Sequence, residues 1–269
     1  MEIQLPYMPD RLSKPRQYGL TMMMDKGLSV RDVESFIETS SAYTDLVKLG
    51  FGTSVITGNI LETKIKLYQE AKIKVYLGGT LFEAYAIRGM VDDYLRLISK
   101  LKLDTAEISD GSMYMPHNQK LDYIRRLSGH VTVLSEVGSK QKGVEIPDHI
   151  WIEMMKTELS TGSWKVIAEA RESGTVGIYH PDGTANVELI SHITDQIESG
   201  KILWEAPTGK QQVWFVKLLG ANVNLGNIAA VDVIPLECLR RGLRGDTFFD
   251  FLPEQLKEYR PDSEKYKKI

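Results

Sequence analysis

The chain has 269 residues, of which 42% are hydrophobic and 26% are charged, and its formal net charge at pH 7 is −3. This composition predicts a folded protein with a sizeable core and excludes an intrinsically disordered chain. The slightly acidic balance argues against nucleic acid and anionic membrane surfaces as partners.

Cysteine usage and the length of the apolar runs indicate the compartment. Cys238 is the only cysteine, so an intramolecular disulfide is excluded and a reducing cytoplasm is predicted. No stretch of about 18 apolar residues is present, which predicts a protein without a membrane span. Residues 1–20 lack the apolar segment of a secretory signal. We therefore expect a cytoplasmic protein.

Short apolar runs recur along the chain, with longer amphipathic segments between them. Their starts are roughly 20 to 35 residues apart, which is the size of one βα unit. The runs occupy residues 19–25, 44–52, 74–80, 105–111, 131–138, 165–171, 201–207 and 221–228. Such continuous hydrophobicity is typical of parallel strands buried on both faces. The eight units predict an α/β fold, a single (β/α)8 TIM barrel over residues 1–269, with an arm at 1–17 and a charged tail at 250–269.

Helical patterns lie between the apolar runs. In residues 28–41, Ser29 is a predicted N-cap, and the apolar residues behind it share one face. Residues 83–101 carry apolar side chains at helical spacing. In residues 147–159, Pro147 is placed near a helix start. These patterns predict a helix after most of the strands.

Charged or amide residues close nearly every apolar run, and in a TIM barrel the C-terminal strand ends form the functional face. Glu107, Glu136 and Glu169 occupy matching places on three successive predicted strands. Neighbouring strands lie about 4.8 Å apart, so these carboxylates can converge on one hard cation such as Mg²⁺. The alternative is that each glutamate pairs with a local lysine or arginine. We predict a Mg²⁺ site at these glutamates.

Three cationic residues accompany the glutamates. Lys48 lies inside an apolar run, Lys140 follows Glu136 by four residues, and Arg171 follows Glu169 by two. A lysine beside carboxylates can hold an anion or donate a proton, whereas a lone loop lysine is usually only solvated. We predict that these three cations are catalytic.

A further cationic segment follows the last strand. The stretch LRRGLRGDTF carries Arg241 and Arg244, and barrels often bind phosphate in the loops after strands seven and eight. Arginine offers a planar fork for bidentate contacts to phosphate. The alternative is a surface cluster in which these arginines pair with Glu237 and Asp246.

Several longer motifs resemble those of the phosphosulfolactate synthases, which serve coenzyme M biosynthesis in methanogens and have relatives in spore-forming bacteria. The likeness runs from about Gly19 to Thr247. Its motifs include DKGL at 25–28, VKLGFGTS at 47–54, KVYLGGTLFE at 74–83, EARESG at 169–174 and LRRGLRGDTF at 239–248. The resemblance implies a (β/α)8 barrel, dependence on Mg²⁺, and phosphoenolpyruvate and sulfite as substrates.

The resemblance also implies a proton donor just after the EVG motif. The family pattern has two adjacent lysines there, whereas this chain has Ser139 and Lys140, so the role maps onto Lys140. The expected reaction is attack of sulfite on the methylene carbon, with Mg²⁺ stabilising the charge that develops on the carboxylate. The residues expected to bind the phosphate are Asn224, Gly226, Asn227, Arg241 and Arg244.

Two other functions stay open at this point. One is a different Mg²⁺-dependent lyase or aldolase that acts on a phosphorylated carboxylate. The other is a non-catalytic relative of the plant heat-stress-associated proteins, which are similar to this family. Trp151 and Trp214, on predicted outer helices, mark either a homo-oligomer interface or packing against the barrel.

Overall fold

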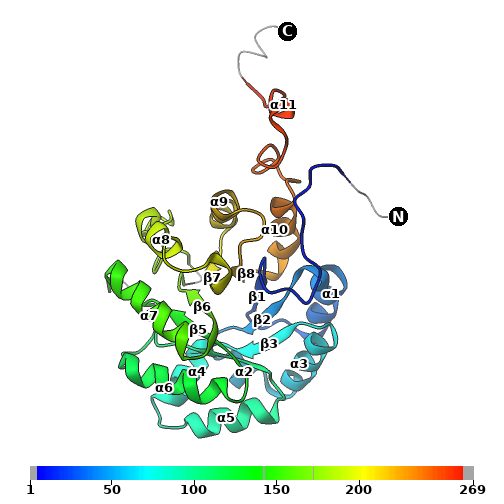
Figure 1. Cartoon of the computed structure of the whole chain (residues 1–269). Coiled ribbons are helices and arrows are strands. Elements are labelled where there is room, and N and C mark those ends of the chain that lie inside the picture. The colour runs from blue at the N-terminus through cyan, green and yellow to red at the C-terminus, as the bar shows by residue number, and fades with distance from the viewer. Residues whose placement is uncertain (1–4, 142, 172, 263–269) are drawn as a thin grey trace.

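The computed structural model describes residues 5–141, 143–171 and 173–262. Eight parallel strands form a nearly closed barrel with helices around it, which confirms the predicted (β/α)8 TIM barrel (Figure 1). The strands are β1 (Thr21–Asp25), β2 (Leu46–Leu49), β3 (Lys74–Leu77), β4 (Thr105–Ile108), β5 (Thr132–Val137), β6 (Ser163–Ala168), β7 (Ile202–Glu205) and β8 (Leu225–Ile228). Seven of them lie within a predicted apolar run, and β6 begins two residues before the predicted run at 165–171.

Helices connect the strands on the outside of the barrel (Figure 1). The α-helices are α1 (Val30–Ser40), α2 (Thr53–Ile56), α3 (Leu61–Glu70), α4 (Gly79–Ala86), α5 (Val91–Lys100), α6 (His117–Ser128), α7 (Asp148–Thr161), α8 (Val187–Thr194), α9 (Gly209–Leu219), α10 (Val233–Arg240) and α11 (Glu254–Lys257). The 3-10 helices are η1 (Ser41–Tyr43), η2 (Gly58–Ile60), η3 (Ser199–Lys201) and η4 (Ala230–Asp232). Among the described residues, no helix has both the length and the apolar character needed to cross a membrane.

The strand order is β3-β2-β1-β8-β7-β6-β5-β4, so β3 and β4 are the two ends of the sheet. These strands pack against each other, but no backbone ladder joins them in the described part of the chain. Side chains connect the two strands instead. Lys74 Nζ lies 2.5 Å from Asp104 Oδ2 at the N-terminal ends of the strands, and Gly79 N donates to Glu107 Oε1 at 2.8 Å near their C-terminal ends.

Two packed layers surround the strands. The larger core fills the space between the barrel and its helices and includes the buried Trp151, so this tryptophan packs within the chain. A smaller apolar layer fills the barrel interior. Its buried members are Leu20, Met22, Leu46, Tyr76, Leu134, Ile167 and Leu203. Because alternate strand residues point to the same face, the residue two positions after each of these also faces the interior.

The N-terminal arm crosses the end of the barrel where the strands begin. Arg11 pairs with Glu237, and Arg16 Nε lies 2.8 Å from Asp45 Oδ1 just before β2. Farther along the arm, the backbone carbonyl of Gln17 accepts a hydrogen bond from Lys165. Of the predicted tail at 250–269, residues 263–269 lie outside the described residues.

The predicted cap of α1 is confirmed and gives a stability prediction. Ser29 Oγ accepts from Asp32 N at 3.2 Å, and Asp32 Oδ2 accepts from Ser29 N at 3.0 Å, a reciprocal capping box. Replacing Ser29 with alanine leaves helix N–H groups without this acceptor, so we expect the free energy of unfolding to fall by about 1 kcal/mol. Urea denaturation measures the loss. Ser35→Ala, on the exposed face of the same helix, is the control and should leave stability nearly unchanged.

Candidate active site

Four polar side chains of the candidate site each lie two residues after a member of the interior apolar layer. Lys48 follows Leu46, Glu136 follows Leu134, Glu169 follows Ile167, and Glu205 follows Leu203. This spacing of two places all four side chains on the inner face, above an apolar floor. The site therefore lies at the C-terminal ends of the strands, where barrel enzymes carry their chemistry.

A cavity of about 230 Å³ opens at this end of the barrel. Its lining residues are Met24, Lys48, Phe51, Gly79, Thr80, Glu107, Ser112, Glu136, Lys140, Glu169, Arg171, Glu205 and Asn227. All six of the predicted catalytic and metal residues belong to this set. Of the five predicted phosphate-binding residues, Asn227 lines the cavity.

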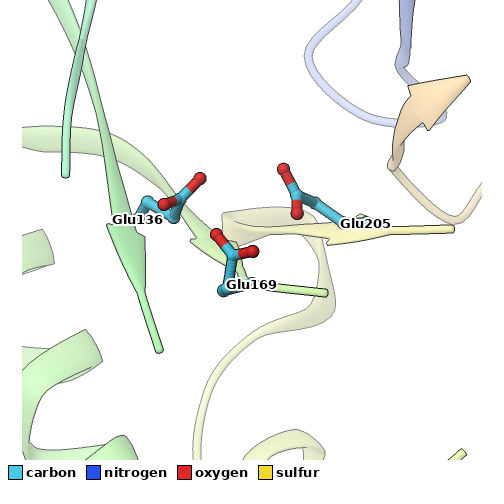
Figure 2. Close-up of side chains that lie close together, drawn as sticks. All are labelled: Glu136, Glu169 and Glu205. Atoms are coloured by element: carbon cyan, nitrogen blue, oxygen red, sulfur yellow. The ribbon is translucent and has the colours of Figure 1, made fainter. Parts of the chain in front are cut away.

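Three carboxylates converge in the cavity. Glu136 on β5, Glu169 just after β6 and Glu205 on β7 point toward one another (Figure 2). One oxygen from each lies within 4.8 Å of the others, and all three side chains are buried. The register explains part of the grouping: Ala168 pairs with Trp204, which brings Glu169 and Glu205 to the same level, whereas Glu136 pairs with Ile167, two residues before Glu169.

Glu107, which the sequence placed in the metal set, lies outside this group. It pairs with Leu134 in the register, two residues below Glu136. Its Oε1 atom lies 3.0 Å from Lys48 Nζ and accepts from Gly79 N. Glu205 takes its place among the three converging carboxylates, and the register between β6 and β7 places it level with Glu169.

Two lysines lie among the carboxylates. Lys48 Nζ is 3.3 Å from Glu205 Oε1 and 3.4 Å from Glu136 Oε2. Lys140 Nζ pairs closely with Glu136 Oε1 and lies 3.4 Å from Glu169 Oε2. Burial alone would lower the pKa of Lys140, but Glu136 and Glu169 raise it above its ordinary value, so the side chain is an ammonium at neutral pH.

The cavity is lined by more carboxyl groups than cationic side chains, since Glu107, Glu136, Glu169 and Glu205 face Lys48, Lys140 and Arg171. Burial raises the pKa of Glu107 to about 7, with a contribution from Glu136 and against the effect of Lys48. Burial together with Glu136 and Glu205 raises the pKa of Glu169 well above its ordinary value. Uncompensated carboxylates of this kind favour an added cation.

The donor atoms fit a hard divalent ion. Carboxylate and amide oxygens are the ligands that such ions prefer. In addition to the three converging carboxylates, Asn227 brings a buried Oδ1 atom that has no hydrogen-bond partner. The described residues thus include a buried acidic group able to hold a metal ion.

Arg171 lines the cavity from the loop after β6. Its φ of 44° lies in the left-handed region, where non-glycine residues are uncommon, and its backbone N donates to Glu169 Oε1 at 2.6 Å. The side chain is exposed, and within the described part of the chain no carboxylate lies within ion-pair distance of it. A guanidinium in this position is available to an anionic ligand.

The remaining predicted phosphate-binding residues lie away from the cavity. Asn224 precedes β8, accepts from Leu20 N at 3.0 Å, and donates to Ile202 O at 2.8 Å, all at the opposite end of the barrel. Gly226 lies within β8, where an added Cβ would approach Met22 Cε to 2.8 Å. Its lack of a side chain serves packing.

The two arginines of the predicted set are also elsewhere. Arg241 follows α10, which leads back toward the start of the strands, and it pairs with Glu237 at 2.8 Å and lies over the Tyr43 ring. Arg244 pairs with Asp246 at 3.0 Å. The surface-cluster interpretation, with Glu237 and Asp246 as partners, therefore agrees with the structure.

These placements give a contrast between two asparagines. Asn224→Ala removes buried hydrogen bonds, so we expect stability to fall by about 1–3 kcal/mol while activity per folded molecule stays the same. Asn227→Ala removes a cavity oxygen and should lower activity with a smaller loss of stability. Urea denaturation and steady-state kinetics on both variants test this. Equal losses of activity would contradict the placement.

Sequence reasoning missed three buried residues beside the cavity. Glu83 on α4 accepts from Ser112 N at 2.8 Å, and Ser109, just after β4, bonds both Glu83 and Glu136. Lys120 on α6 donates to Glu136 O at 2.5 Å. Their helix or strand-end positions carry no distinctive spacing, so only the three-dimensional contacts reveal them.

Comparison with known proteins identifies the family. The profile of (2R)-phospho-3-sulfolactate synthase (ComA) matches residues 9–246. The chain belongs to the phosphosulfolactate synthase family. It is 38% identical over 245 residues to phosphosulfolactate synthase of Bacillus subtilis (strain 168), covering 90% of this chain and 97% of that protein. It is 40% identical over 239 residues to the Methanocaldococcus jannaschii phosphosulfolactate synthase, covering 86% and 94%.

Other similarities are more distant. Protein HEAT-STRESS-ASSOCIATED 32 of Arabidopsis thaliana is 25% identical over 256 residues, covering 86% of this chain and 88% of that protein. Among solved structures, 3-hexulose-6-phosphate synthase from Salmonella typhimurium aligns with a TM-score of 0.55 at 11% identity, covering 84% of this chain and 100% of the other. At that identity the structural likeness shows the fold alone.

Proposed function

We propose that this chain catalyses the addition of sulfite to phosphoenolpyruvate, giving (2R)-O-phospho-3-sulfolactate, and that Mg²⁺ is the metal it uses. One observation carries the proposal. In a chain of the phosphosulfolactate synthase family, the ammonium of Lys140 lines a cavity that is also lined by Lys48, Arg171 and three converging carboxylates.

The reaction brings together anions, and the cavity offers fixed cations for them. The sulfur lone pair attacks the methylene carbon, a C–S bond forms, and the π electrons of the C=C bond move to the neighbouring carbon and its carboxylate. Lys48 and Arg171 line the cavity and would hold anionic substrate groups. Lys140 then transfers a proton to the carbon that carries the phosphate, which completes the product. The lysine regains its proton from solvent, since its side chain is 19% exposed.

Glu136, Glu169 and Glu205 would hold the metal, with Asn227 Oδ1 as a further oxygen nearby in the cavity. When bound, Mg²⁺ supplies positive charge where the substrate carboxylate gains electron density. Lys48 keeps two of these glutamates oriented through its contacts to Glu136 and Glu205. The apolar floor beneath the cavity limits water on that side.

The test is an incubation of the purified protein with phosphoenolpyruvate, sulfite and Mg²⁺, with product followed by mass spectrometry and EDTA in a parallel sample. Phosphosulfolactate that forms only with metal supports both parts of the proposal. Product that persists in EDTA contradicts the metal requirement. Folded, metal-loaded protein that makes no product contradicts the reaction, and a panel of phosphorylated carboxylates then tests for another lyase activity.

A further inference from the structure

We propose that Ser109, anchored by Glu83, is a positioning residue that holds the Lys140 ammonium and one oxygen of Glu136 in the orientation that the reaction needs. The inference deepens the proposed function and rests on it. It concerns two residues that neither directly line the cavity nor belong to the predicted catalytic set.

Ser109 is completely buried just after β4, between the carboxylates and the lysine. Its Oγ atom lies 2.8 Å from Glu136 Oε1 and 3.2 Å from Lys140 Nζ, and it forms a short hydrogen bond with Glu83 Oε1. One hydroxyl therefore contacts the proposed proton donor, a proposed metal ligand and a third carboxylate.

Counting protons shows why this hydroxyl fixes the arrangement. A serine oxygen carries one proton and two lone pairs. The lone pairs accept from the Lys140 ammonium and from Gly111 N at 3.3 Å. The single proton goes to one carboxylate, Glu83 or Glu136, and the other carboxylate contacts the hydroxyl oxygen without receiving that proton. All three hydrogen bonds that the hydroxyl can form have partners here, so a shift of Ser109 would deprive the Lys140 head group of one of its contacts.

Glu83 gives the serine a rigid support. Its side chain is 3% exposed, and its second oxygen accepts from Ser112 N at 2.8 Å. Because Ser112 and Ser109 belong to the same loop, Glu83 on α4 clamps both ends of the turn after β4. Lys140 is itself attached to this turn, since Lys140 N donates to Gly111 O at 2.9 Å. The turn thus holds the lysine by its backbone and by its ammonium.

The first arm of the test compares Ser109→Ala with Ser135→Ala. We expect Ser109→Ala to lower kcat by roughly 10- to 100-fold, because a misplaced reacting group costs about that much, with little change in KM for phosphoenolpyruvate. Ser135 is an equally buried serine on neighbouring β5, and its Oγ accepts from Ser163 Oγ at 2.8 Å and hydrogen-bonds Glu158 rather than the cavity carboxylates. Its alanine variant controls for loss of a buried hydroxyl and should keep kcat.

The second arm is a double-mutant cycle. If Ser109 acts through Lys140, adding Ser109→Ala to a Lys140→Ala background should cost almost nothing further. Glu83→Gln should show the same coupling. Independent, multiplicative losses in this cycle would overturn the proposal, as would a Ser109→Ala variant with the kcat of the control.

A third readout requires no turnover, so it separates this inference from the proposed reaction. The rate at which an amine-reactive acetylating ester labels Lys140, measured by peptide mass spectrometry, should rise several-fold in Ser109→Ala and stay unchanged in Ser135→Ala. An unchanged labelling rate would show that the serine does not hold the lysine, whatever reaction the protein catalyses.

Discussion

Lys140→Ala is expected to lower kcat for phosphosulfolactate formation by about 10²- to 10⁴-fold, which is the usual contribution of a positioned general acid. The ammonium of Lys140 lies against Glu136 and Glu169 at the cavity, and among the cavity lysines it is the more exposed one. Without it, protonation of the substrate carbon depends on solvent. Steady-state kinetics measures the loss, and thermal denaturation confirms that the variant is folded.

A second substitution separates proton donation from charge. Lys140→Arg keeps the positive charge, but a guanidinium does not release its proton in proteins, so it should be nearly as inactive as the alanine variant. Lys66→Ala, with a side chain that is 76% exposed, is the matched surface control. Near-normal turnover in the arginine variant would reduce Lys140 to an electrostatic role, and near-normal turnover in the alanine variant would exclude it from the reaction.

Glu205→Gln is expected to weaken the binding of Mn²⁺, a spectroscopic substitute for Mg²⁺, by about 100-fold or more, since losing a partner that only supports a ligand already costs 10- to 100-fold. Glu107→Gln should weaken it by less than about 10-fold, because the Glu107 carboxylate faces Lys48 and Gly79 N. Titration of the protein with Mn²⁺, followed by electron paramagnetic resonance, measures both affinities without any need for turnover.

The pair of variants decides between two metal sites. The sequence pointed to Glu107, Glu136 and Glu169, whereas the structure groups Glu205 with the last two. A larger effect of Glu107→Gln than of Glu205→Gln would restore the first set. Equal, small effects of both would place the metal elsewhere. Urea denaturation of each variant ensures that a change in affinity reflects the site and not unfolding.

The strands were predictable because parallel barrel strands are buried on both faces and therefore read as continuous apolar runs. The helix boundaries were less predictable from the sequence. The segment 83–101 has helical spacing throughout, but it forms α4 and α5 with a turn between them, where Gly89 has a φ of 69°. A glycine in a helical pattern is compatible with either outcome, so spacing alone does not locate the break.

The site was predictable where it depended on strand ends and unpredictable where it depended on register. Glu136 and Glu169 stand at the C-terminal ends of predicted strands, which brought them into the prediction. The register between β6 and β7, which brings Glu205 level with Glu169, is not encoded in the order of residues. Asn224 shows a related difficulty, because an amide one residue before a short strand and one at its end look alike in sequence.

The absence of a ladder between β3 and β4 has a thermodynamic consequence. Backbone groups at such an edge exchange with solvent through local openings that cost less free energy than global unfolding. The hydrogen bond from Gly79 N to Glu107 joins β3 and β4, and both residues line the cavity. A ligand that binds the cavity only when these two strands are in contact therefore stabilises that contact and opposes their separation. The hydrogen-exchange rates of backbone amides in β3 and β4 are thus thermodynamically linked to occupancy of the cavity. Measuring these rates would detect ligand binding without a probe at the reacting groups.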